Sequence, residues 1–127
     1  MRISVFGMLF VLGLAACGRV RPDPMQEMRR ELITAEEIEA SNARDAYDAI
    51  KKLRANFLSY RGRTSLNNTS SAEPIVYVDD QLYGPLSSLR TIPAGQIEAI
   101  RLYRAWEATS KYGTGLMGGV IAVYTRQ

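Results

Sequence analysis

The sequence predicts a small α+β domain in which short helices cover a small mixed β-sheet. The chain has 127 residues, which leaves room for one domain at most. Stretches with helical periodicity and stretches rich in β-branched residues both occur, and they do not alternate in the regular rhythm of a doubly wound fold. The sequence has no internal repeat and no low-complexity segment, which is also typical of one small domain.

Two helix starts are predicted in the first half of this domain. Thr34, with Glu37 three residues later, forms a capping box ahead of a short helix that carries Ile38. Asn42 with Asp45 is a second cap-like start. The helix that follows has one apolar face, whose members recur at spacings of four, three and four: Ala46, Ile50, Leu53 and Phe57. We expect this helix to end near residues 59–62.

Three strands are predicted in the second half. Residues 75–78 form a β-branched run, and Asp79 and Asp80 begin the reversal of the chain. In "IEAIRLYRA", residues 97–105, apolar and polar side chains alternate as in a half-buried strand. The uncharged run in "GVIAVYTR", residues 119–126, predicts the final strand.

The segments between these strands predict short helical turns and loops. "PLSSLRTIPAGQ" predicts a helical turn that Pro93 and Gly95 stop, and "WEATSKYG" predicts one or two further turns of helix. "RTSLNNTSSAE", residues 63–73, is polar and rich in Asn, Ser and Thr, so we expect an exposed loop.

The N-terminus predicts a bacterial lipoprotein signal. Met1 and Arg2 precede an almost wholly apolar stretch, residues 3–16. As a helix it would span about 21 Å, short of the roughly 30 Å hydrocarbon core of a bilayer. The stretch ends in "LGLAACG", and its residues 14–17 resemble the lipobox, in which signal peptidase II cleaves just before a diacylated cysteine. Cys17 is the only cysteine, so we expect lipidation there and no intramolecular disulfide.

These features divide the chain into three expected parts. Residues 1–16 are the signal peptide, and residues 17–30 are a flexible tether that carries two prolines and mixed charge. Residues 31–127 are the folded domain. Gly18, rather than Asp, follows the cysteine. In the lipoproteins that this start resembles, that choice favours export to the outer membrane.

Composition argues against several classes of function. The net charge is +3 and no block of like charge occurs, so we expect no nucleic-acid partner. The chain has no His, the commonest general base and metal ligand, and its lone Cys is expected to be acylated. We therefore expect no enzyme and no catalytic residue. Asp79 and Asp80, with Glu73 nearby, supply too few oxygens for a calcium site and predict a turn instead, so no metal is expected.

A basic cluster follows the second predicted helix start. Its members are Lys51, Lys52, Arg54, Arg61 and Arg63. Such a cluster can touch anionic lipid headgroups, but a solvated helix face and loop is the interpretation that we favour.

The closing glycines need a separate explanation, because Gly113, Gly115 and Gly118 spell G-x-G-x-x-G. A dinucleotide-binding turn needs a helix after the glycines and an acidic residue about 20 positions later. Here a predicted strand follows, and only nine residues remain after Gly118. We therefore expect no nucleotide and no cofactor. Gly113 fits the end of a helix, and Gly118 and Gly119 would let the final strand pack closely against its neighbours.

Several segments together resemble the plug domain of TonB-dependent outer-membrane receptors. The matching pieces of the second half are "VYVDD", "IEAIRLYRA" and "YGTGLMGGVIAVYTR". In the first half, "LITAEEIEASNARDAYDAIKKLR" resembles the opening strand and paired helices of that family. The likeness covers about residues 31–126. It implies a plug-like fold and, more weakly, work at the outer membrane through protein contacts.

The chain also departs from this family. The family's first turn is usually Asp-Gly, where this chain has Asp79-Asp80, and Arg104-Ala105 stands where Lys-Gly is common. No apolar strand like a TonB box precedes the domain, and no barrel follows it within the 127 residues. Transport activity is therefore not implied.

The sequence leaves two functions open. The first is a lipid-anchored, plug-like domain that faces the periplasm and binds another protein of the outer membrane, such as a TonB-dependent receptor. The second is a small lipoprotein that captures a siderophore, glycan or peptide. The residues that we expect on an interaction surface are Asp79, Asp80, Tyr103 and Trp106.

Overall fold

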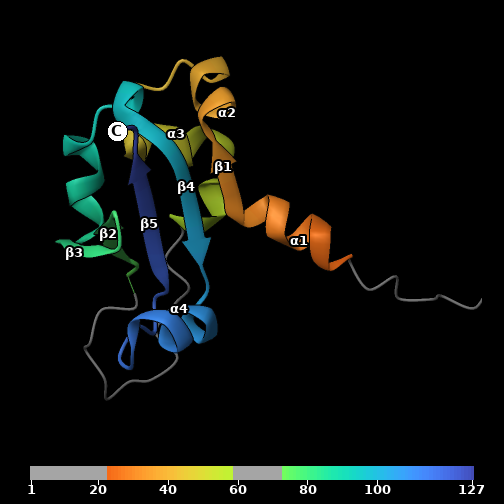
Figure 1. Cartoon of the computed structure of the whole chain (residues 1–127), viewed down its shortest axis with the longest axis vertical. Helices are drawn as coiled ribbons and strands as arrows, with labels where there is room; N and C mark the ends of the chain where they lie inside the picture. Colours follow the sequence, from red (N-terminus) through yellow and green to blue (C-terminus); the bar gives the residue numbers. More distant parts are fainter. Residues whose placement is uncertain (1–22, 59–72) are drawn as a thin grey trace, which may run out of the picture.

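The fold is built on one five-stranded mixed β-sheet (Figure 1). The computed structural model describes residues 23–58 and 73–127. The strands are β1 (Leu32–Thr34), β2 (Ile75–Val78), β3 (Gln81–Gly84), β4 (Ile97–Tyr103) and β5 (Val120–Thr125). Their order across the sheet is β1-β4-β5-β2-β3, and all neighbours are antiparallel except β2 and β5, which run parallel. The predicted class, a small mixed sheet with short helices, is confirmed.

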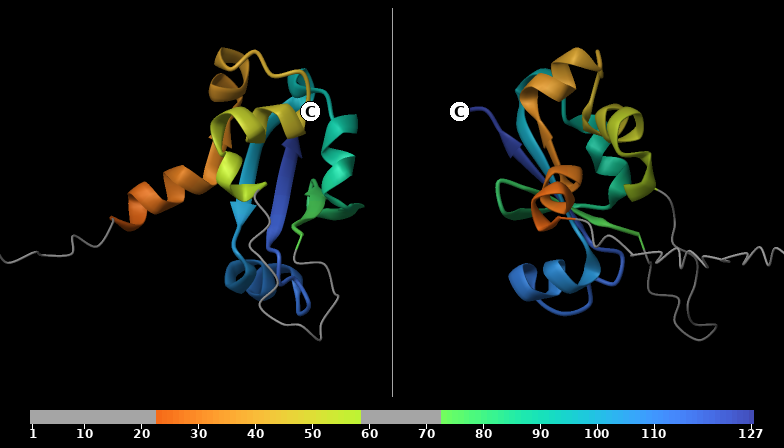
Figure 2. Two further views of the ribbon diagram at one scale, coloured as in Figure 1. Left: turned by 180° about the vertical axis from the view of Figure 1, so that it is seen from behind. Right: turned by 90° about the vertical axis from the view of Figure 1, so that its right-hand side faces the viewer.

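The helices are short and surround this sheet. They are α1 (Pro24–Glu31), α2 (Ala35–Ala40), α3 (Ala46–Leu53) and α4 (Ala105–Tyr112), with 3₁₀ turns η1 (Ala55–Phe57), η2 (Leu86–Thr91) and η3 (Ala94–Gln96). Helix α3 lies across one face of the sheet, and α4 lies at one end of the sheet, towards its other face (Figure 2). Helix α1 projects from the body of the domain beside β1 (Figure 1).

The main core fills the space between α3, η2 and the sheet. Ile100 and Leu102 of β4, together with Ile121 and Val123 of β5, are fully buried there. Ile50 of α3 packs on the same cluster and is also fully buried. A second, smaller cluster lies on the other face, beneath α4. Because strand residues alternate between faces, β4 and β5 supply both clusters.

The capping box of α2 is confirmed. The Thr34 hydroxyl accepts a hydrogen bond from the Glu37 backbone N–H at 3.4 Å, and the Glu37 carboxylate accepts one from the Thr34 N–H at 3.3 Å. Ile38 then lies buried in the core. These bonds satisfy two backbone donors that the first turn of a helix otherwise leaves unpaired.

The start of α3 is confirmed at Asp45 but not at Asn42. Asp45 is the N-cap, and its carboxylate accepts the Asp48 N–H at 2.8 Å. Asn42 instead has a φ of +50°, a value that Asn tolerates in the turn that follows α2. The end of α3 was placed too late by the sequence pattern, because the helix stops at Leu53. Phe57 continues the apolar face from η1 and packs on the main core.

The turn predicted at Asp79 and Asp80 is confirmed as a two-residue hairpin loop. Val78 of β2 pairs with Gln81 of β3, and the two aspartates between them have φ values of +49° and +63°. Two successive positive φ values match the type I′ turn, whose twist fits a hairpin. Gly, Asn and Asp are the residues that best tolerate positive φ values, so Asp79 and Asp80 are compatible with this turn.

The expectation of a flexible tether over residues 17–30 is wrong for its last part. Residues 24–31 form α1, whose N-cap Asp23 accepts the Met25 N–H at 3.1 Å. Pro24 stands at the first helical position, where its missing N–H has no cost. The two prolines and mixed charge of this segment favoured a tether, but Asp23-Pro24 is also a helix start. Residues 17–22 lie outside the described residues.

Candidate functional site

Three of the four residues expected on an interaction surface, Asp79, Asp80 and Tyr103, make contacts within the domain. Asp79 accepts two hydrogen bonds from Thr125, one from the backbone N–H at 2.9 Å and one from the hydroxyl at 2.6 Å. The bond from the hydroxyl and the bond from the N–H both hold the pKa of Asp79 below its usual value. The hairpin loop is thereby tied to the end of β5.

Asp80 is the centre of a network of one lysine and two tyrosines. Its Oδ1 accepts hydrogen bonds from Lys111 Nζ and from the Tyr112 hydroxyl, both at 2.7 Å. A longer bond of 3.5 Å comes from the Tyr124 hydroxyl. The bond from Lys111 is the main cause that lowers the pKa of Asp80. The network joins the β2–β3 hairpin to α4 and to β5.

Lys111 is held by several partners at once. Besides Asp80, its Nζ donates hydrogen bonds to the hydroxyls of Tyr103 and Tyr124, each at 3.2 Å. Partial burial opposes the charge of Lys111, but the hydrogen bonds outweigh this effect and hold the pKa of the lysine well above its usual value. Lys111 therefore stays charged, which excludes it as a general base at neutral pH.

Tyr103 is buried in the second core cluster, so the expectation that it lies on the interaction surface is wrong. Its ring meets that of Tyr112 edge to face, with ring centroids 5.6 Å apart. The ring centroids of Tyr112 and Tyr77 are 4.2 Å apart. Burial raises the pKa values of Tyr103 and Tyr112 above their usual range. The rings of Tyr103 and Tyr112 pack in the second core cluster. Their hydroxyls form hydrogen bonds with Lys111 and Asp80, respectively.

The closing glycines form a turn that leads into β5. Gly113 follows α4 with a φ of +103°, Gly115 has +93°, and Gly119 has +84°. Gly119 is buried, and an added Cβ would overlap the carbonyl oxygen of Tyr103. The close packing predicted for Gly118 and Gly119 is therefore found at Gly119. A strand follows the glycines, as predicted, and not the helix that a dinucleotide turn requires.

Trp106 is exposed, with 70% of its surface accessible, and Asp79 and Asp80 are exposed as well. Trp106 lines a groove of about 220 Å³ between α1, β4 and α4, which Met28 and Pro24 of α1 also line. The groove contains Arg104, whose Nε lies 2.8 Å from Glu31 Oε1.

Arg104 joins α1 to the start of α4. Besides Glu31, its Nη2 lies 3.4 Å from Glu27 Oε1. Glu31 is the buried charged residue among those that the structure describes, with 7% exposure. Burial and the nearby carboxylate of Glu107 raise the pKa of Glu31, while the Arg104 guanidinium opposes the rise. The sequence comparison noted Arg104 only as a departure from a family pattern and gave no sign of this role.

Arg54 makes a second link to α1, which the sequence reading also missed. Its Nε donates to the Arg30 carbonyl at 2.9 Å, and its Nη2 donates to the Arg29 carbonyl at 3.3 Å and to Glu37 Oε1 at 3.3 Å. The last carbonyls of a helix lack partners within the helix, and Arg54 supplies them. The sequence favoured a solvated helix face for the basic cluster that includes Arg54. For Arg54 this expectation is wrong, because its side chain binds α1. Arg61 and Arg63 lie outside the described residues.

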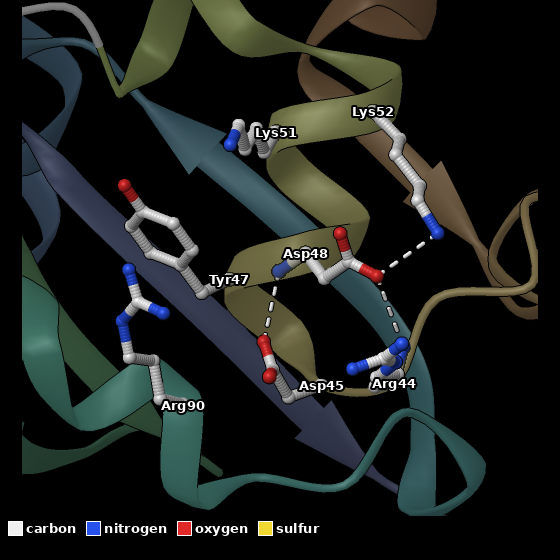
Figure 3. A pocket seen from close by; sticks show the side chains of 7 residues that line it. All are labelled: Arg44, Asp45, Tyr47, Asp48, Lys51, Lys52 and Arg90. Atoms are coloured by element: carbon white, nitrogen blue, oxygen red, sulfur yellow. Dashed lines mark hydrogen bonds and ion pairs between the residues drawn. The ribbon is translucent and has the colours of Figure 1, made fainter.

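A second hollow, of about 370 Å³, lies on the outer side of α3 (Figure 3). Its lining combines four cations with two aspartates and a tyrosine: Arg44, Asp45, Tyr47, Asp48, Lys51, Lys52 and Arg90. The Arg90 guanidinium lies 4.1 Å from the centroid of the Tyr47 ring. Figure 3 shows Lys51 extending from α3 towards the side of the hollow that holds Tyr47 and Arg90.

Both aspartates of this hollow are already bonded within the fold. Asp45 caps α3, and Asp48 lies 2.9 Å from Lys52 Nζ and accepts the Arg44 N–H at 3.2 Å. The bond from Lys52 is the first cause of the lowered pKa of Asp48. Lys51 makes no hydrogen bond or ion pair with the part of the chain that is described. The hollow therefore carries positive charge that is not neutralised inside it.

Residues 23–58 and 73–127 contain neither a cluster of metal ligands nor a helix suited to cross a membrane. In these ranges no three His, Cys, Asp or Glu side chains are grouped closely enough to hold a metal ion. None of their helices has both the length and the apolar character that a membrane crossing needs. Cys17, the expected lipidation site, lies outside these ranges.

Comparisons with known proteins add no relative. No family model matches the chain, and neither a curated protein nor a solved structure matches it. The likeness to receptor plug domains therefore rests on the segments quoted above and stays a prediction.

Proposed function

We propose that this chain is a lipid-anchored envelope protein whose plug-like domain binds another protein at the outer membrane, on the periplasmic side. It would be accessory to TonB-dependent uptake, and it would not be an enzyme. The observation that carries the proposal is that the motifs shared with receptor plugs coincide with the three central strands β2, β4 and β5 and with the glycine turn before β5. The lipobox-like residues 14–17 supply the membrane anchor.

The proposal is tested by purifying the acylated protein from bacterial membranes after mild crosslinking. We expect a β-barrel receptor to be recovered in a fixed ratio to it. A matched preparation of Trp106→Ala, which alters an exposed side chain, reports whether the α4 side takes part. Recovery of the protein without any barrel partner would contradict the proposal.

The anchor has its own test. Mass spectrometry should find Cys17 as an acylated N-terminal residue, and Cys17→Ser should move the protein from the membrane fraction to the soluble fraction. A variant at Gly18, which retains the cysteine, controls for effects on export. Membrane fractionation of Cys17→Ser at the level of the unaltered chain would contradict a lipid anchor.

A second candidate function is the capture of a small ligand, and the hollow on α3 favours it. Lys51 and Arg90 supply positive charge there, and the Tyr47 ring offers a face for stacking. An anionic siderophore, glycan or peptide would suit such a hollow. Lys51→Ala with Arg90→Ala should then abolish recovery of a copurified small molecule while leaving any barrel partner bound.

A further inference from the structure

Three exposed apolar side chains gather beside the N-terminal end of the described chain. Met25 and Met28 of α1 are 66% and 57% exposed, and Trp106 of α4 is 70% exposed. Met28 and Trp106 line the same groove, and Met25 lies one helical turn before Met28, on the same side of α1. We call Met25, Met28 and Trp106 the α1–α4 face.

Charged side chains of both signs border this face. At 100° per residue, Arg29 lies beside Met25 on the surface of α1, about 40° further round the helix. The acidic residues of the neighbouring turn, Glu27 and Glu31, are both bound to Arg104. The single guanidinium offsets about one of these two carboxylate charges, and Glu107 and Arg101 add one charge of each sign to the same groove. An apolar stripe with arginine on its flank is the arrangement that interfacial helices use on anionic membranes.

The orientation of α1 is fixed by the fold. Arg54 binds the carbonyls of Arg29 and Arg30 at the C-terminal end of the helix. Arg104 binds Glu27 and Glu31 on the side that faces the groove. The start of α1 therefore has a defined position relative to α4 and Trp106. A membrane anchor attached just before α1 would therefore place the side of the domain that carries α1 and α4 next to the membrane.

The distance from that anchor is short. Cys17 and Asp23 are six positions apart, which allows about 20 Å even if the chain is fully extended. Two of the five intervening residues are Arg19 and Arg21. Basic residues within this distance of a bilayer are attracted by anionic headgroups. Both the reach and the charge favour contact between α1 and the membrane surface.

We propose that the α1–α4 face lies against the surface of an anionic phospholipid bilayer, with Trp106 inserted at the headgroup level. The proposal rests on the lipid anchor of the proposed function and adds the orientation of the domain on the membrane. The occupant is a bilayer rather than a protein, because the short basic connection brings this face, and not the β3 edge, next to the anchor. Tryptophan is the residue most typical of the membrane interface.

The chain carries its own probe, because Trp106 is its one tryptophan and Cys17 its one cysteine. The chain from Cys17 onward contains every residue that the structure describes. Its Cys17 thiol can be coupled to a maleimide phospholipid in vesicles of phosphatidylethanolamine and phosphatidylglycerol. We expect a blue shift of Trp106 emission, and about a twofold loss of intensity when the acyl chains carry bromine near the headgroup.

Two variants make the test specific. Met25→Glu with Met28→Glu should restore the unshifted, unquenched emission of the uncoupled protein, with an unchanged circular dichroism spectrum. Leu82→Glu is the matched control, because Leu82 is an exposed apolar residue of β3, at the far edge of the sheet from β1. That variant should keep the shift and the quenching.

Absence of both shift and quenching in the coupled protein would overturn the proposal, since the face would then be open to water or to a protein partner. Equal quenching of the Met25→Glu, Met28→Glu variant would overturn it as well. Because the anchor is installed chemically, the result does not depend on whether cells acylate Cys17. Failure of the proposed function would instead appear as an unmodified Cys17 or as the absence of a barrel partner.

Discussion

At the scale of single residues, Gly119 is the position where the backbone tolerates least change. It combines a φ of +84° with a position at which an added Cβ would overlap the carbonyl oxygen of Tyr103. A side chain there would meet both the strain of a left-handed conformation and a clash with backbone. The residue thus joins the entry of β5 to the end of β4.

We expect Gly119→Ala to lower the free energy of unfolding by about 2–4 kcal/mol, because the two effects add. Urea denaturation followed by circular dichroism measures it. Gly115→Ala is the matched control: its φ is +93° but the added Cβ meets nothing, so about 1 kcal/mol is expected. Equal midpoints for the two variants would show that close packing at Gly119 contributes nothing.

Asp80 predicts a dependence of stability on pH. Its pKa is lowered in the fold, chiefly by Lys111, so its contribution is present above the unfolded pKa of about 4 and is lost as pH falls through the folded value. Half of the side chain is exposed, so we expect Asp80→Asn to cost only about 0.5–1 kcal/mol at pH 7. The difference between the two proteins should shrink below pH 4.

The control for this measurement is Glu98→Gln, because Glu98 is exposed on β4 and forms no ion pair within the described residues. Urea titrations at pH 7 and at pH 3 compare the three proteins. A difference between Asp80→Asn and the unaltered chain that grows as pH falls would contradict the role given to Asp80.

The residue scale also marks the limit of the sequence reading at the candidate site. Asp79 and Asp80 were correctly predicted in a turn, because turn chemistry is local. Their partners Thr125, Lys111 and Tyr112 lie more than 30 positions away. No local pattern indicates such contacts, so the sequence did not reveal the bonds that hold the two aspartates within the domain. Trp106 is exposed, and its place on an interaction surface stays a prediction.

At the scale of elements, the strands β2, β4 and β5 and the starts of α2 and α3 were predicted, because each has a local cause, whereas β3 was not. The run 75–78 matches β2, and the capping box of Thr34 and Glu37 matches the start of α2. The end of α3 and the existence of α1 were not predicted. Arg54, the C-cap of α3, lies where the two helices meet, and its guanidinium binds the carbonyls of α1. A contact of this kind spans 24 positions and has no periodic signature.

Helix α1 should loosen when Arg54 is removed. We expect Arg54→Ala to speed hydrogen exchange of the amides of 26–31 while the amides of β4 and β5 stay protected. The loss of several charge-assisted bonds to carbonyls corresponds to about 1–2 kcal/mol. Lys51→Ala, three positions earlier on α3 and without a described partner, should leave exchange in α1 unchanged. Unaltered protection of 26–31 in Arg54→Ala would contradict the link.

At the scale of the whole molecule, the two faces of the sheet differ in composition. This difference explains why the fold class could be predicted from the sequence. One face of β4 and β5 is uniformly apolar and carries the main core, which periodicity reveals. The other face carries Tyr103, Ala122 and Tyr124 and is covered by α4. Strand order could not be read, because the parallel contact of β2 with β5 joins segments more than 40 positions apart.

The residues of the two core clusters and of the five strands predict how much of the chain the fold needs. Neither core cluster contains a residue of α1, and all five strands lie within residues 32–125. A chain that begins at Leu32 should therefore fold cooperatively, and it should lose only about 1–3 kcal/mol through the missing partners of Arg54 and Arg104. Urea denaturation compares it with a chain that begins at Gly18, which retains α1. A non-cooperative transition would show instead that α1 belongs to the core of the fold and that the domain starts before residue 31.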